Sequence, residues 1–214
     1  SAGSTCVATA REHRDNYVGP GGDRGAVSAS SLRGTPSMNS FKADIEEIRR
    51  RAMEKIDDGA VTASYKADRE RVVEVLNEVL ATETVCVLRY KNHYYMAQGI
   101  HGQSVENEFL EHATEEQDHA DRVAKRITEL GGTPNLNPDG LATRSHAQYG
   151  SAETLQEMIK EDLIAERIAI ATYSEIVRWL GNDDPTTRRL IEELLAKEEE
   201  HADDMAKLMT RVGK

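Results

Sequence analysis

The chain has 214 residues, enough for one domain with a sizeable hydrophobic core. Its formal net charge of −11 disfavours nucleic-acid binding, because phosphates would be repelled, and favours interaction with cations. The two cysteines form no C-x-x-C motif, which argues against a disulfide scaffold or a zinc ribbon. No apolar run approaches the ~18 residues of a membrane span, and the first residues lack the apolar segment of a signal peptide. We therefore expect a cytoplasmic protein without a membrane segment.

The first part of the chain is expected to lie outside the main domain. Residues 1–37 are rich in Gly, Ser, Ala and Arg without hydrophobic periodicity, and we interpret them as a disordered tail. The tail is close to neutral, because it contains four Arg and three acidic residues, so DNA binding through it is not favoured. Residues 38–63 are expected to form an N-terminal helix, over about 39–57, and a linker.

Residues 64–214 predict a bundle of four long helices, because apolar residues recur there at spacings of three and four. The expected helices span approximately residues 66–96, 104–131, 152–180 and 185–209. We expect the third to begin after the N-cap Ser151 and end at Gly181, and the fourth to begin at Asp184 before a proline. The long link at 131–150 suits a crossover between two antiparallel hairpins, as in an all-α, ferritin-like four-helix bundle.

A Glu-x-x-His motif that occurs twice is the most informative feature of the sequence. The copies, Glu116 to His119 and Glu198 to His201, lie 82 residues apart, and each is followed by Ala-Asp. The preceding helix in each half contributes a glutamate seven residues before a tyrosine: Glu83 with Tyr90, and Glu166 with Tyr173. A single Glu-x-x-His is usually a solvated helix face, but four glutamates and two histidines in register predict a two-metal carboxylate site.

The positions of these ionisable residues carry the argument for metal. They interrupt the inward apolar stripe near the middle of each helix, where an unneutralised carboxylate costs several kcal/mol. No lysine or arginine is expected at the same level of the stripes. Two divalent cations would cancel the four negative charges, and two neutral imidazoles would complete the ligand set. Carboxylate and imidazole ligands without thiolate favour iron or manganese, and zinc can occupy such sites.

Residues 66–210 resemble the ferritin-like superfamily, and most of all bacterioferritin and the Dps-like mini-ferritins. The segment LNEVLATE, ending at Glu83, resembles the first-helix motif of bacterioferritin, and EEQDHADR around Glu116 resembles its second-helix motif. GGTPNL at 131–136 resembles the turn that follows. Asp162 with Glu166, and EEEH ending at His201, match the third and fourth helices.

The resemblance implies a role for each residue of the site. Glu83 and His119 would be the terminal ligands of one iron ion, Glu166 and His201 those of the other, and Glu116 and Glu198 would bridge the two. Tyr90 matches the tyrosine beside the diiron centre, where it could donate an electron or hydrogen-bond a ligand. Glu115, Asp162 and Tyr173 are expected to support the ligands from behind. In the second motif, Lys197 occupies the position that corresponds to Glu115 in the first, where the family pattern has an acidic residue.

Two departures from the family pattern shape the expected assembly. Bacterioferritin ligates haem through a methionine after the bridging glutamate of its second helix, whereas this chain has Gln117, so we predict no haem. Only 13 residues follow His201, which leaves no room for the fifth helix of 24-subunit ferritins. We therefore expect a homo-oligomeric cage of 12 subunits rather than 24, with each metal site inside one subunit.

Three functions compete. The leading hypothesis is a ferroxidase that oxidises Fe(II) with O2 or H2O2 at two iron ions per subunit and stores Fe(III) in the cage. The second is a peroxide-consuming diiron or dimanganese enzyme similar to rubrerythrin or manganese catalase. The third is a DNA-protecting protein of the Dps type.

Four other residues have less specific expected roles. Cys86 is interpreted as a buried apolar residue rather than a redox group, although the sequence does not decide between them. His112 could be an accessory metal ligand or a hydrogen-bonded core histidine. His93 belongs to an aromatic cluster at the end of the first long helix and, with its neighbour Tyr94, is expected at a surface or interface.

Overall fold

The computed structural model describes residues 41–97, 102–150 and 152–212 of the chain. Every regular element in these ranges is helical, which confirms the expected all-α class. The elements are α1 (Ile45–Ala52), a 3-10 turn (Ile56–Asp58), α2 (Arg69–Met96), α3 (Gly102–Glu129), α4 (Leu141–Arg144), α5 (Leu155–Leu180) and α6 (Pro185–Val212). No helix in the described ranges is long and apolar enough to cross a membrane. The predicted tail at 1–37 lies outside the described residues.

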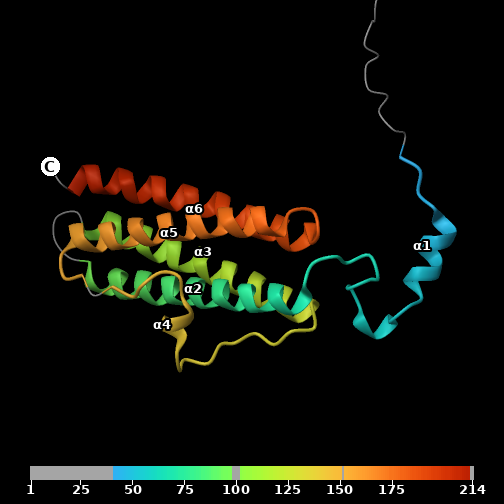
Figure 1. The fold of residues 1–214 in the computed structure, drawn as a ribbon. Coiled ribbons are helices and arrows are strands. Elements are labelled where there is room, and N and C mark those ends of the chain that lie inside the picture. Colours follow the sequence, from blue (N-terminus) through green and yellow to red (C-terminus); the bar gives the residue numbers. More distant parts are fainter. Residues whose placement is uncertain (1–40, 98–101, 151, 213–214) are drawn as a thin grey trace, which may run out of the picture. The chain divides into compact units, whose positions relative to one another are not determined.

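Helices α2, α3, α5 and α6 form the bundle as two hairpins (Figure 1). Helix α2 packs mainly against α3, and α5 mainly against α6. The amino-terminal halves of α2 and α6 share one apolar cluster with the carboxy-terminal halves of α3 and α5, so the two helices of each hairpin are antiparallel. The chain must therefore travel the length of the bundle between α3 and α5, and this crossover contains the short helix α4, which contacts α2.

The ends of the long helices follow local sequence signals. Thr154, rather than Ser151, is the N-cap of α5, because its hydroxyl accepts from the Glu157 backbone and the Glu157 carboxylate reciprocates in a capping box. Gly181 ends α5 with φ = 51°, a conformation that glycine adopts without strain. Asp184 precedes Pro185 at the start of α6, as the sequence predicted.

The N-terminal helix is shorter than expected. Helix α1 covers Ile45–Ala52 instead of 39–57, with the side chain of Asp44 capping its first turn. The chain then departs from helical geometry, since Lys55 and Gly59 both have positive φ. Helix α2 likewise begins three residues later than expected, at Arg69, where the carboxylate of Asp68 accepts from the backbone N–H of Arg71.

The interior of the bundle consists of two apolar clusters separated by a polar layer. One cluster contains residues such as Leu76, Ile127, Leu180 and Ile191, and the other contains Phe109, Ile159, Met205 and Leu208. On every long helix the chain positions between these clusters carry buried acidic residues. Burial of the apolar clusters stabilises the bundle, and it also fixes the level at which the polar layer lies.

A buried polar network closes the end of the bundle where α6 begins. Asp184 accepts from the Thr187 backbone at 2.9 Å, from the Tyr65 hydroxyl at 2.9 Å and from the Arg126 guanidinium at 3.2 Å. Burial alone would raise the pKa of Asp184, but hydrogen bonds from Thr187 and Tyr65 and the charge of Arg126 lower it below its ordinary value of 3.8. The network joins the segment before α2 to α3 and α6.

This lowered pKa predicts a pH-dependent contribution to stability. A depressed carboxyl pKa stabilises the fold above the unfolded-state pKa, and that stability is lost as pH falls through 3.8 toward the folded-state value. We expect Asp184→Ala to lower the free energy of unfolding by about 1–2 kcal/mol at pH 7 and by clearly less at pH 3. Urea unfolding of metal-free wild type and variant at both pH values measures the difference. An equal difference in unfolding free energy between wild type and variant at the two pH values would contradict the lowered pKa of Asp184.

Candidate metal centre

Six buried residues from the four long helices meet in the polar layer. Their ligand atoms form two overlapping groups, each compact enough to hold a metal ion. One group is Glu83, Glu116, His119 and Glu198, and the other is Glu116, Glu166, Glu198 and His201. All six side chains are almost completely buried. The structure thus brings together all six residues singled out in the sequence, and the two groups share two glutamates.

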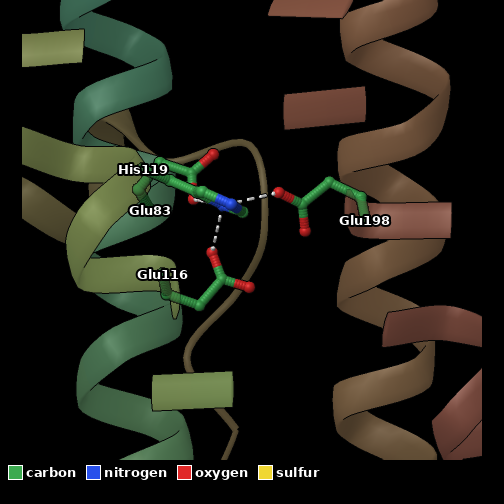
Figure 2. Close-up of side chains that lie close together, drawn as sticks. All are labelled: Glu83, Glu116, His119 and Glu198. Carbon is green, nitrogen blue, oxygen red and sulfur yellow. Dashed lines mark ion pairs between the residues drawn. The ribbon is translucent and has the colours of Figure 1, made fainter. Parts of the chain in front are cut away.

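The first group is centred on the imidazole of His119 (Figure 2). Its Nδ1 lies 3.1 Å from Glu198 Oε1, 3.4 Å from Glu83 Oε2 and 3.5 Å from Glu116 Oε2. Glu83 comes from α2, Glu116 and His119 from α3, and Glu198 from α6. Because Glu116 and His119 are one turn apart on α3, both side chains point to the same side of that helix.

The second group has the same form around His201. Its Nδ1 lies 3.2 Å from Glu116 Oε1, 3.7 Å from Glu198 Oε2 and 4.0 Å from Glu166 Oε2. The other ring nitrogen, Nε2, lies 2.6 Å from Glu115 Oε2. Glu115 therefore orients the ring from behind, with Nδ1 directed into the cluster, as an outer carboxylate does for a metal-bound histidine.

Two buried tyrosines support the outer glutamates crosswise between the hairpins. The Tyr90 hydroxyl on α2 donates to Glu166 Oε1 on α5, and the Tyr173 hydroxyl on α5 donates to Glu83 Oε1 on α2. Each bond occupies one carboxylate oxygen and leaves the other facing the centre. Burial is the main cause that raises the pKa of both phenols, and the charges of nearby carboxylates raise it further, so both hydroxyls remain hydrogen-bond donors.

The carboxylates perturb one another strongly because water is excluded. Burial raises the pKa of Glu83 and of Glu166, and the charges of Glu116 and Glu198 raise it further. Burial alone would lower the pKa of His201, but hydrogen bonds with Glu116 and Glu198 raise it to about 11. Without a metal ion, protons on the imidazoles balance part of the negative charge. Cations that bind at Nδ1 must displace such protons.

Buried atoms that form no hydrogen bond indicate that the residues fit a metal site. Atoms without a hydrogen-bond partner in the layer are Glu83 Oε2, Glu116 Oε2, Glu166 Oε2, Glu198 Oε1 and His119 Nδ1. Leaving so many buried polar atoms unsatisfied is costly, and each of them is a metal-ligating atom type. Four carboxylates and two imidazoles suit iron, manganese or zinc, and two divalent ions match the four negative charges.

A buried arginine changes the electrostatics expected from the sequence. Arg89 on α2 is 1% exposed, and its Nε donates to Asp162 Oδ1 at 2.9 Å, a buried charge that the sequence analysis did not single out. Asp162 Oδ2 lies 2.9 Å from His93 Nδ1. Asp162 therefore orients Arg89 and His93, and not one of the six cluster residues. His93 is fully buried, so its expected surface position is wrong.

The sequence contained a signal for this network. Cys86, Arg89 and His93 follow Glu83 at helical spacings of three and four, so they lie on the same inward face of α2. Arg89 also contacts the sulfur of Cys86, at 3.3 Å. Burial raises the pKa of the Cys86 thiol well above its usual range, which keeps it neutral and weakly nucleophilic.

The remaining predicted residues lie around the cluster. His112 is buried with its ring stacked on that of His201, at 4.1 Å between centroids. Burial, as the larger cause, and the charge of His201 together lower the pKa of His112 to about 4. Gln117 is exposed and donates to Asp121 at 3.0 Å. Lys197 Nζ lies 2.8 Å from Glu200 and 3.5 Å from Glu115.

Comparison with known proteins agrees with this architecture. A family model described as ferritin-like domain matches residues 73–213. The DNA protection during starvation protein of Pyrococcus furiosus is 30% identical over 151 residues, 67% of this chain and 79% of that protein. The bacterioferritin of Brucella melitensis is 34% identical over 136 residues, 62% of this chain and 79% of that protein.

Solved structures show the same relationship. A dodecameric thioferritin, the bacterioferritin-related protein of Bacteroides fragilis, superposes with a TM-score of 0.66 at 31% identity, covering 69% of this chain and 89% of that one. Dps from Thermosynechococcus elongatus has a TM-score of 0.63 at 21% identity, covering 65% and 90%, which shows likeness of fold alone. The family match spans most of the chain and includes all six residues of the cluster, so the chain belongs to the ferritin-like domain family.

Proposed function

We propose that this protein is a ferroxidase that binds two Fe(II) ions per chain, oxidises them and stores the Fe(III) product. The observation that carries the proposal is the pair of overlapping four-residue groups that share Glu116 and Glu198. Shared carboxylates can bridge two cations, and each group retains one further glutamate and one histidine of its own. The relatives named bacterioferritin support an iron substrate.

The residues of the cluster divide the work between the two ions. Glu83 and His119 would be terminal ligands of one ion, and Glu166 and His201 those of the other. Tyr173 and Tyr90 donate hydrogen bonds to the outer oxygens of Glu83 and Glu166. These bonds fix the carboxylate rotamers, so that the free oxygens would already face the ions. The dry surroundings strengthen these charge interactions and keep bulk water away.

The redox chemistry belongs to the iron substrate, while the protein supplies geometry and charge. Two Fe(II) ions lose one electron each, and these two electrons with two protons convert O2 to H2O2, or H2O2 to two waters. Six ligands with four negative charges also suit the Fe(III) product, whose higher charge binds carboxylates more strongly.

We further propose that the chains assemble into a hollow homo-oligomer of 12 subunits. The related Bacteroides fragilis protein, at 31% identity, is a dodecamer. The net charge of −11 per chain would attract Fe(II) to such a shell at low ionic strength. DNA protection is the second candidate function, because the Pyrococcus furiosus relative carries that name, although the acidic charge of this chain opposes contact with phosphates.

Anaerobic titration with Fe(II), followed by admission of oxidant, tests the proposed function. We expect two Fe(II) to be bound at the buried cluster of each chain, rapid oxidation with O2 or H2O2, and iron retained in excess of two per chain. Native mass spectrometry of the loaded particle should then report about twelve subunits. Release of O2 from peroxide by the manganese form without iron, in a particle with two ions per chain, would instead assign a peroxide-consuming enzyme. A gel shift at physiological salt tests DNA binding.

A further inference from the structure

A third group of possible metal ligands lies beside the buried cluster. It consists of Glu108 and His112, one turn apart on α3, and Asp204 on α6. One ligand atom from each residue lies within 4.8 Å of the other two. Ligands at about 2.1–2.3 Å from one ion are roughly 3–4 Å apart, so small rotamer changes would close this group around a cation.

The hydrogen-bond chain around Tyr90 determines which atom of His112 faces this group. The hydroxyl hydrogen of Tyr90 is donated to Glu166, so toward His112 Nδ1, at 3.2 Å, its oxygen can only accept. His112 Nδ1 must therefore carry the hydrogen. In this neutral tautomer the free lone pair is on Nε2, and a neutral imidazole nitrogen with a free lone pair can bind a metal ion.

The surroundings of this lone pair point to a cation. His112 is 97% buried, since only 3% of it is exposed, and its Nε2 lies 3.8 Å from Glu108 Oε1, too far for a hydrogen bond. A lone pair facing carboxylate oxygens is repelled unless a positive ion lies between them. Lys207 contacts Asp204 at 3.0 Å, but this lysine is half exposed and is also shared with Asp203 at 2.6 Å.

We propose that Glu108, His112 and Asp204 form a third divalent-cation site, through which Fe(II) passes on its way to the buried pair. One imidazole nitrogen and two carboxylates are the ligand types of Fe(II), Mn(II) and Zn(II). The side chains of Glu108 and Asp204 are 32% and 30% exposed, so water can complete the shell and an ion can enter. The ring of His112 stacks on His201, which places the third site one imidazole away from the buried pair.

The site itself is independent of the proposed ferroxidase function, whereas its role in delivery depends on that function. We expect the double variant E108Q/D204N to bind one Mn(II) or Fe(II) per chain fewer than wild type in anaerobic calorimetry. An anomalous difference map from Mn(II)-soaked crystals should lose the peak beside His112 and retain the two peaks at the buried cluster. Asp203→Asn is the matched control, because it removes a neighbouring charge that contacts the same lysine.

Kinetics test the delivery step. We expect E108Q/D204N to raise the KM for Fe(II) by at least about tenfold, with kcat changed less than about twofold. Asp203→Asn should leave both constants unchanged. An absent peak beside His112 in wild type, or equal binding by wild type and double variant, would overturn the site, and an unchanged KM would overturn its role in delivery. A peak beside His112 together with an empty buried cluster would keep the third site and refute the proposed function.

Discussion

Replacing Glu116 with Ala is expected to abolish rapid Fe(II) oxidation, with a loss of at least about 100-fold. Glu116 belongs to both four-residue groups, and its two oxygens lie 3.2 Å from His201 Nδ1 and 3.5 Å from His119 Nδ1. Its removal therefore weakens both ion positions at once and takes away a bridge between them. Stopped-flow absorbance after mixing the anaerobic Fe(II) protein with O2, and separately with H2O2, measures the effect.

A neighbouring acid on the same helix provides the control for this variant. Asp118 is 68% exposed at its side chain and belongs to neither group, so Asp118→Ala should oxidise Fe(II) at the wild-type rate. Circular dichroism should show the same helix content for all three proteins, because neither substitution disturbs the apolar clusters. Oxidation by Glu116→Ala at the wild-type rate would show that the chemistry occurs elsewhere.

Replacing Arg89 with Met is expected to destabilise the protein by about 3–5 kcal/mol. The substitution removes the cationic partner of Asp162 in the interior, where both side chains of the ion pair are at most 1% exposed, and leaves this carboxylate only its contact with His93. A long apolar side chain fills much of the same volume, so the loss reports the unpaired charge rather than a cavity. Chemical unfolding of the metal-free protein, with a two-state fit, measures the difference.

A second substitution separates the ion pair from packing. In Arg89→Met combined with Asp162→Asn, the buried charge is removed, and we expect about half or more of the lost stability to return. Arg178 forms an ion pair with Glu175 in which both side chains are exposed, so Arg178→Met should cost less than about 1 kcal/mol. Equal losses for Arg89→Met and Arg178→Met would contradict the interior role of Arg89.

Much of the fold could be predicted from local patterns. Helix starts and ends followed short-range signals such as Asp184 before Pro185 and Gly181 after α5. The N-cap of α5 was misplaced because Thr154 forms a full capping box with Glu157, which a single favourable residue such as Ser151 does not reveal. The N-terminal helix was overextended because apolar spacing alone does not show where backbone geometry breaks.

The six-residue cluster was found because its signal is periodic and repeated, whereas the buried network around Arg89 was missed. An arginine next to a tyrosine on α2 reads as a surface residue until its partner is known. That partner, Asp162, is 73 residues away on α5, and only the packing of the hairpins brings the two together. The helical spacing of Cys86, Arg89 and His93 after Glu83 places Arg89 on the inward face of α2, but it does not reveal the partner on α5.

The amino-acid sequence by itself determined the four long helices and most of the residues that face inward, because helical periodicity and end signals act over a few neighbouring residues. It also determined the ligand types of the centre, through two Glu-x-x-His motifs in register. The family resemblance implied that Glu116 and Glu198 are shared, but only the tertiary structure gives the contacts by which both belong to two groups and by which Glu115 orients His201. These are contacts between helices from opposite hairpins, and their distances depend on how the apolar clusters on either side pack.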